Sequence, residues 1–94
     1  MALAWGVAST AFAGSGNPDC IDVWGEVRYG SYGYDHVVHI RNRCEAVAEC
    51  DVSSNVNPTP SRVTVAPKAE AEVLTFRGSP AREFSPRADC RLLS

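Results

Sequence analysis

The four cysteines are the residues of this 94-residue chain whose chemistry depends most on spacing: Cys20, Cys44, Cys50 and Cys90. The inner two, in the segment CEAVAEC, have five residues between them. Redox pairs of the thioredoxin type use C-x-x-C, and structural zinc sites use pairs of cysteines with two to four residues between them. An even number of cysteines in so short a chain is typical of disulfides formed in an oxidising compartment. We therefore expect two structural disulfides, no metal and no other cofactor.

The disulfide pairing is open at the level of the sequence, because four cysteines allow three pairings. We favour Cys44–Cys50 across a tight turn with Cys20–Cys90 joining the two ends of the domain, at about 2.4 and about 4.4 kcal/mol of loop entropy. The alternative, Cys20–Cys44 with Cys50–Cys90, gives about 3.5 and about 3.9 kcal/mol. The totals differ by less than the error of the relation, so loop entropy does not choose between the two pairings.

The two histidines, His36 and His39, are the residues to test for metal binding or acid–base chemistry. A spacing of three puts both on one face of a helix but on opposite faces of a strand, and residues 34–42 are rich in β-branched side chains. Asp35 and His36 also diverge on a strand, and no G-x-S-x-G motif marks a serine nucleophile. Because the acidic residues are scattered as well, we predict no metal site, no catalytic site and no enzyme activity.

The segment RYGSYGYD carries three tyrosines separated by glycine and serine: Tyr29, Tyr32 and Tyr34. Tyrosines on glycine- and serine-rich loops supply rigid amphipathic contacts in antibody paratopes, and their rings also stack on sugars or peptides. The alternative is a hairpin whose glycines take positive φ and whose tyrosines cover the edge of the fold. The segment is our first candidate for contact with a protein or glycan partner.

Charge is unevenly distributed along a chain whose net charge is only −2. Residues 14–60 carry seven acids against three arginines, whereas residues 77–94 carry two acids against four arginines, Arg77, Arg82, Arg87 and Arg91. These arginines are candidates for an anion-binding strip or for contact with the acidic half of a second copy, which would make a homo-oligomer. The alternative is that acids on neighbouring strands neutralise them. The near balance of charge gives no reason to expect a nucleic-acid partner.

The first residues differ from the rest of the chain. Residues 1–13 have no charge, and Ala11-Phe12-Ala13 fits the small-x-small pattern that precedes signal-peptidase cleavage, which would make Gly14 the first mature residue. The apolar run is too short to span a membrane. We predict a signal peptide over residues 1–13, whose usual basic start lies upstream of Met1, and a single domain over residues 14–94. The alternative is a buried N-terminal helix or strand.

Alternating apolar and polar residues predict short strands between turn signals that recur about every ten residues. We expect these strands at 20–29, 34–42, 48–56, 62–67, 68–76 and 83–93, with turns at GSYG and at Cys44–Cys50 and breaks at NPTPS and RGSP. Segment 68–76 contains helix formers, but its second half is β-branched and aromatic. The fold class predicted is all-β: a small antiparallel β-sandwich of six or seven short strands, stapled by two disulfides that compensate for a small core.

The run HVVHIRN, followed by a short turn and CDVSSNV, resembles consecutive strands of bacterial secreted immunoglobulin-like or fibronectin-III-like domains. The run RVTVAPKAEAEVLTF is similar to their unit of strand, proline turn and strand. The likeness covers about half of the chain and is one of pattern. Because Trp24 precedes both candidate core cysteines, the Cys…Trp…Cys arrangement of true immunoglobulin domains is not present. The resemblance implies an architecture and a bacterial origin, and no functional residues.

These observations predict an exported, non-catalytic binding or structural module, located outside the cell, in the periplasm or at the cell surface. One alternative is a self-associating surface or fibre component that uses its charged ends and edge strands. Another is a small secreted protease inhibitor or effector that uses the tyrosine segment or RGSPAREF. A minor hydrolase is the last.

Overall fold

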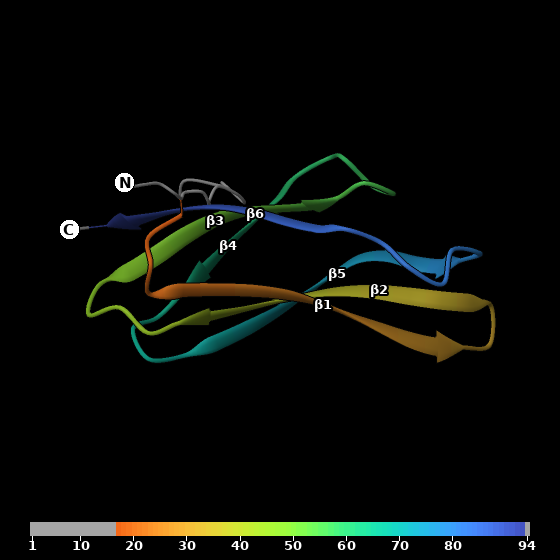
Figure 1. Ribbon diagram of the computed structural model, residues 1–94, viewed down its shortest axis with the longest axis horizontal. Helices are drawn as coiled ribbons and strands as arrows, with labels where there is room; N and C mark the ends of the chain where they lie inside the picture. Colours follow the sequence, from red (N-terminus) through yellow and green to blue (C-terminus); the bar gives the residue numbers. More distant parts are fainter. Residues whose placement is uncertain (1–16, 94) are drawn as a thin grey trace, which may run out of the picture.

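The computed structural model describes residues 17–93, which form two antiparallel three-stranded sheets packed face to face (Figure 1). One sheet has the order β1-β2-β5 and the other β4-β3-β6. The strands are β1 (Ile21–Gly30), β2 (Gly33–Asn42), β3 (Val47–Ser54), β4 (Ser61–Val65), β5 (Glu70–Ser79) and β6 (Pro86–Leu93). The predicted all-β antiparallel sandwich is confirmed, with six strands. The signal peptide expected over residues 1–13 lies outside the described residues.

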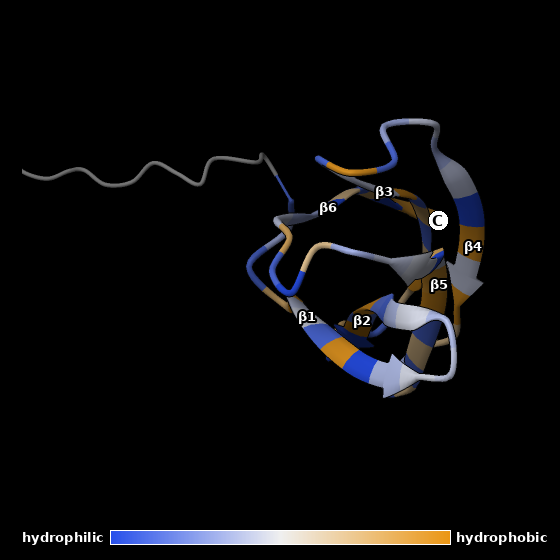
Figure 2. Ribbon diagram, turned by 90° about the vertical axis from the view of Figure 1, so that its right-hand side faces the viewer, coloured by the Kyte–Doolittle hydropathy of each residue, from blue (hydrophilic) through white to orange (hydrophobic). Residues whose placement is uncertain are grey.

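The core lies between the two sheets because alternate residues of each strand point inward. The end-on view of Figure 2 shows β1 beside β6 and β4 beside β5, with the core enclosed between them. The apolar side chains that are fully buried include Val38, Ile40, Ala48, Cys50 and Val52. On β2 the alternate residues His36, Val38, Ile40 and Asn42 are fully buried, and Val37 on the opposite face is buried as well. Among residues 17–93 no helix has the length and apolarity that crossing a membrane requires.

The disulfide pairing that we favoured is wrong, and the alternative is correct. Cys20 is bonded to Cys44 and Cys50 to Cys90. The expected turn over residues 44–50 ends early, because β3 begins at Val47. Cys50 therefore lies in the middle of a strand, directly opposite Cys90 on β6, with their Cα atoms 4.0 Å apart. The register of two distant strands thus selects the pairing that loop entropy left open.

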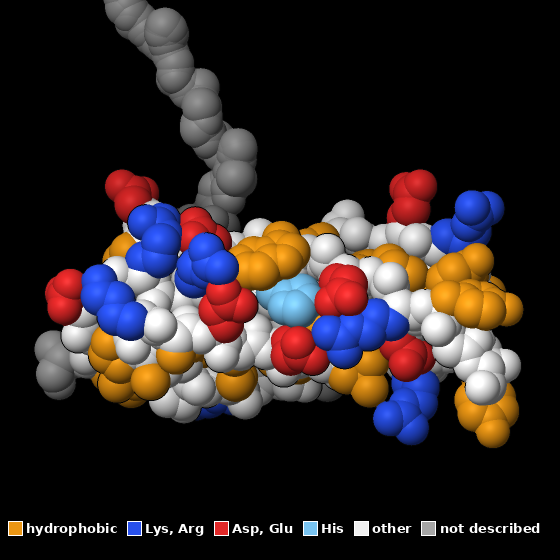
Figure 3. All heavy atoms as spheres, turned by 90° about the horizontal axis from the view of Figure 1, so that it is seen from below, with side chains coloured by type: hydrophobic (Ala, Val, Ile, Leu, Met, Phe, Trp, Pro, Cys, Tyr) orange, Lys and Arg blue, Asp and Glu red, His pale blue; other side chains and the backbone are white. Residues whose placement is uncertain are grey.

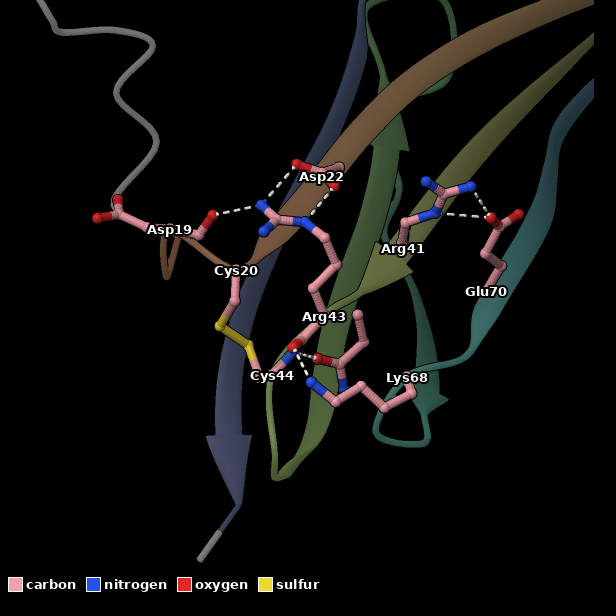
Figure 4. A network of polar contacts seen from close by, with 9 residues as sticks. Asp19, Cys20, Asp22, Arg41, Arg43, Cys44, Lys68 and Glu70 are labelled. Atoms are coloured by element: carbon pink, nitrogen blue, oxygen red, sulfur yellow. Dashed lines mark hydrogen bonds and ion pairs between the residues drawn. A yellow bond between two sulfur atoms is a disulfide. The ribbon is translucent and has the colours of Figure 1, made fainter.

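A polar network holds the connection from β2 to β3 beside the Cys20–Cys44 bridge (Figure 4). The Arg43 guanidinium donates to both oxygens of Asp22, at 2.7 and 3.1 Å, and to the Asp19 carbonyl at 2.8 Å. Lys68 Nζ donates to the Arg43 carbonyl at 2.8 Å. The start of β1, the β2–β3 turn and the β4–β5 turn are therefore fastened together at this end of the sandwich.

β6 is an edge strand, and the side chain of Asn17 covers part of its edge. The Asn17 amide donates to the Ala88 carbonyl at 2.8 Å and accepts a hydrogen bond from the Cys90 N–H at 2.8 Å. One side chain thereby satisfies two backbone groups to which a further strand would otherwise bond.

Candidate functional site at the tyrosine end of the sandwich

The β1–β2 turn places the three tyrosines at one end of the first sheet. Tyr29 and Tyr34 are opposite each other in the hairpin, and their rings meet edge to face with centroids 5.2 Å apart. Tyr32 occupies the turn itself, against the end of β5. Arg77 lies on β5 next to this contact, and Arg82 follows the end of β5. We call the group of Tyr29, Tyr32, Tyr34, Arg77 and Arg82 the tyrosine end.

Two of these tyrosines are far more exposed than the other large hydrophobic side chains of residues 17–93. Tyr32 is 87% exposed and Tyr29 79%, whereas the next, Leu74, is 45% exposed. In Figure 3 hydrophobic side chains project from the end of the molecule that carries the β1–β2 turn in Figure 1. Because side chains this exposed bury little area, packing of the fold does not account for them. Tyr34 is half-buried.

Two glycines allow the turn to lie directly on β5. Gly33 has φ +133°, and a Cβ there would stand 2.7 Å from the Ser79 carbonyl oxygen. Gly78 has φ +71°, and a Cβ there would stand 3.3 Å from the Tyr32 Cβ. The Gly78 N–H also donates to the Asp35 carboxylate at 2.9 Å. The position of Tyr32 is therefore fixed by backbone contacts on both strands.

Arg82 is positioned by the segment that follows β5, which is anchored from inside by His36. This histidine is fully buried, and its Nε2–H donates to the Ala81 carbonyl at 2.8 Å. Its ring stacks on Phe84, with centroids 4.4 Å apart, and lies 6.2 Å from the ring of Phe76. The residues on both sides of Arg82 are thus held against β2, while Arg82 itself is exposed.

The arginines of the tyrosine end differ from the others in residues 17–93. Neither Arg77 nor Arg82 has a carboxylate oxygen within 4.0 Å in this part of the chain, whereas the remaining six arginines do: Arg28, Arg41, Arg43, Arg62, Arg87 and Arg91. Neutralisation by an acid on a neighbouring strand therefore holds for Arg91, which pairs with Glu49, whereas Arg87 pairs with Asp89 of its own strand. Arg87 lies in the other sheet, on β6 opposite Ser53, so the structure does not group it with Arg77 and Arg82.

The outer face of the β1-β2-β5 sheet carries a second group of side chains, centred on Trp24, which lies opposite His39. Its ring stacks on His39, with centroids 5.2 Å apart, and the Arg41 guanidinium lies 5.9 Å from the ring centroid. The His39 Nε2–H donates to Glu26 at 2.6 Å. Hydrogen bonds from Arg28 and His39 lower the pKa of Glu26 to about 2. We assign this group to stabilisation of the sheet, because its members are paired with one another.

The two histidines face opposite sides of the sheet, as predicted: His36 is in the core and His39 on the outer face. Within residues 17–93 no three His, Cys, Asp or Glu side chains lie close enough together to hold a metal ion.

Sequence reasoning found the tyrosines and the arginines but missed the residues that join them. Gly78 and Ser79 were assigned to a break, and the structure places them in a bulged part of β5. A glycine between a predicted strand and a proline is the signal that could have identified this contact. The Trp24 group was missed as well, although the alternation of β1 and β2 already put Trp24 on the outer face.

Comparison of the chain with protein-family models, with curated proteins and with solved structures gives no match. The resemblance to immunoglobulin-like or fibronectin-III-like domains therefore stays a prediction.

Proposed function

We propose that the protein is an exported, non-catalytic binding module that contacts a protein or glycan partner through the tyrosine end. The observation that carries this proposal is the exposure of Tyr29 and Tyr32, at 79% and 87%, on a turn fixed against β5. Tyrosine supplies large contact area with little conformational entropy to lose, and tyrosine and arginine are enriched at binding hot spots. Arg77 and Arg82 add hydrogen-bond donors for a partner, because no carboxylate oxygen of residues 17–93 lies within 4.0 Å of either guanidinium.

Export is part of the proposal and has two supports. Both disulfides join segments distant in the sequence, 24 and 40 residues apart, and such bridges persist in oxidising compartments. The uncharged segment at residues 1–13 with its small-x-small pattern is the second support. A bacterial secreted, periplasmic or cell-surface domain of the immunoglobulin-like type would have both features, the disulfides and the N-terminal signal.

The test is a binding screen with a matched pair of variants. Wild-type protein is used to probe a glycan microarray and the secreted proteins of its producing cells, and each ligand found is titrated. We expect Tyr29→Ala/Tyr32→Ala to raise the Kd about thirtyfold or more. This factor corresponds to about 2 kcal/mol, the contribution of one binding hot spot. Leu74→Ala is the control, because Leu74 is exposed on the outer face of the same sheet. Equal binding by the double variant would overturn the proposal.

One observation favours a second function, that of a protease inhibitor. Arg82 is exposed while Ala81 and Phe84, on either side of it, are anchored to His36. A segment held at both sides of an exposed arginine suits the arginine-specific pocket of a trypsin-like protease. If the protein is such an inhibitor, it should inhibit trypsin saturably and Arg82→Ala should abolish that inhibition. Trypsin should also leave residues 81–84 uncut. Cleavage after Arg82 without inhibition would exclude it.

A further inference from the structure

A hollow of about 530 Å³ lies on the outer face of the β4-β3-β6 sheet, beside the β3–β4 connection. This volume falls within the usual range for small-molecule sites. Its polar lining includes Asp51 and Ser53 of β3 and Arg87 and Asp89 of β6, and Pro58 and Pro60 of the connection line it as well. No residue of the tyrosine end lines the hollow, so it is a separate surface.

The β3–β4 connection is held in place by hydrogen bonds. The Asn55 N–H donates to the Ser85 carbonyl at 3.3 Å, and the Ser85 N–H donates to Asn55 Oδ1 at 2.7 Å. Farther along, the Ser54 hydroxyl accepts from the N–H of Asn57 at 3.0 Å, and Asn57 Nδ2 donates to the Thr75 carbonyl at 2.6 Å. A ligand that enters the hollow therefore does not have to order this loop, which removes a cost of binding.

The polar groups of the lining differ in how far the protein already uses them. Asp51 accepts a hydrogen bond from Arg62 at 3.0 Å, and this bond lowers the pKa of Asp51, which keeps it an ionised acceptor. Asp89 contacts only Arg87 among the cations of residues 17–93, at 3.6 Å, and both side chains are more than half exposed. The Ser53 hydroxyl finds no hydrogen-bond partner in this part of the chain. Carboxylate acceptors, a guanidinium donor and a free hydroxyl thus lie around one space.

We infer that this hollow binds a neutral polyhydroxylated ligand, namely one or two units of a sugar. A sugar hydroxyl both donates and accepts, so it can use an aspartate and Arg87 in turn. The two carboxylates would repel an anionic ligand, and Arg87 would repel a cationic ligand. A neutral ligand experiences neither repulsion. The proline rings offer rigid apolar surfaces to the C–H groups of a pyranose. Because Arg62 donates a hydrogen bond to Asp51 and keeps it ionised, Asp51 serves as a hydrogen-bond acceptor for the ligand.

The experiment is an NMR titration of the ¹⁵N-labelled protein with cellobiose, maltose and N,N′-diacetylchitobiose, each to about 50 mM, well above the Kd of a weak sugar site. We expect saturable shifts of backbone amides in residues 51–55 and 85–89 with at least one of the three. Asp89→Ala should weaken that binding about tenfold. Glu83→Ala is the matched control, because Glu83 is an exposed acid outside the hollow, and it should bind as wild type. Tyr29→Ala/Tyr32→Ala should also leave this binding unchanged, which separates it from the proposed function.

Three results would overturn the inference. The first is the absence of saturable shifts with all three disaccharides. The second is shifts that glycerol reproduces at equal concentration or that Asp89→Ala leaves unchanged. The third is tighter binding of glucuronate or glucosamine than of glucose, because it would assign the hollow to a charged ligand.

Discussion

Removing either disulfide should cost the domain a large part of its stability. The bridges close loops with sequence separations of 24 and 40 residues. The chain-entropy relation gives about 3.5 kcal/mol for Cys20–Cys44 and about 3.9 kcal/mol for Cys50–Cys90. Domains of this size are stable by roughly 4–12 kcal/mol. We therefore expect Cys20→Ala/Cys44→Ala and Cys50→Ala/Cys90→Ala to retain roughly 0–8 kcal/mol of stability at 25 °C.

The assay is equilibrium unfolding in urea followed by circular dichroism, with the free energy of unfolding extrapolated to water. The variant that separates the two pairings is Cys44→Ala/Cys50→Ala. In the structure it breaks both bridges and should lose about 7 kcal/mol, whereas in the pairing that the sequence favoured it would break one and lose about 2.4 kcal/mol. Stability of this variant above that of Cys50→Ala/Cys90→Ala would refute the pairing, the β3–β6 register and the reasoning built on them.

Three further predictions test the tyrosine end, the surface charges and the strand edge. Gly78→Ala should lower the free energy of unfolding in urea by about 1–2 kcal/mol, because φ is +71° there and the new Cβ would stand 3.3 Å from the Tyr32 Cβ. Gly30→Ala is the comparison and should lower it less, because its new Cβ would stand 3.8 Å from the nearest atom, the Gly33 carbonyl oxygen. The pKa of Glu26 is lowered from 4.5 to about 2, so its ion pairs stabilise the native state fully above pH 4.5 and less as the pH falls toward 2. Thermal melts should therefore give a lower Tm near pH 2 than at pH 7. In Glu26→Gln the difference between these two Tm values should be smaller. Asn17→Ala exposes two backbone groups at the edge of β6, the Ala88 carbonyl and the Cys90 N–H, and should therefore increase self-association in sedimentation velocity. A variant that stays monomeric at high concentration would contradict this role of Asn17.

Much of the fold could be predicted from alternation, because each half-buried strand shows its two faces in the sequence. Alternation in residues 34–42 places His36 and Val38 on one face and His39 on the other; His36 and Val38 are fully buried and His39 is not, although Val37, beside them, is buried too. Segment 68–76 shows why composition alone is insufficient. Its Ala and Glu residues favour a helix, but pairing with β2 along most of its length makes it a strand.

What could not be predicted depends on contacts between distant strands. The pairing of Cys50 follows from the register of β3 against β6, 40 residues away, and no local pattern encodes that register. The turn read over residues 44–50 was too long because Val47 already pairs with Leu93. Likewise the segment NPTPS was read only as a break, although it forms a wall of the hollow once Ser85 is brought beside Asn55.

The candidate site was half predictable for the same reason. The three tyrosines lie within six residues of one another, so their clustering at one turn could be predicted from the sequence. Arg77 and Arg82 are distant from the tyrosines in the sequence, and they come to the same end of the sandwich through the pairing of β5 with β2 and through the contact of His36 with the Ala81 carbonyl. Arg87 has the same charge and a similar position in the sequence, but β6 carries it into the other sheet.

The most direct test of the central claim is a pair of measurements on Tyr29→Ala/Tyr32→Ala: its affinity for a partner of the wild-type protein and its free energy of unfolding. If the tyrosine end serves binding, affinity should fall about thirtyfold or more while the free energy of unfolding changes by less than about 0.5 kcal/mol. Unchanged affinity, or loss of the folded state, would show that these tyrosines serve the fold and not recognition.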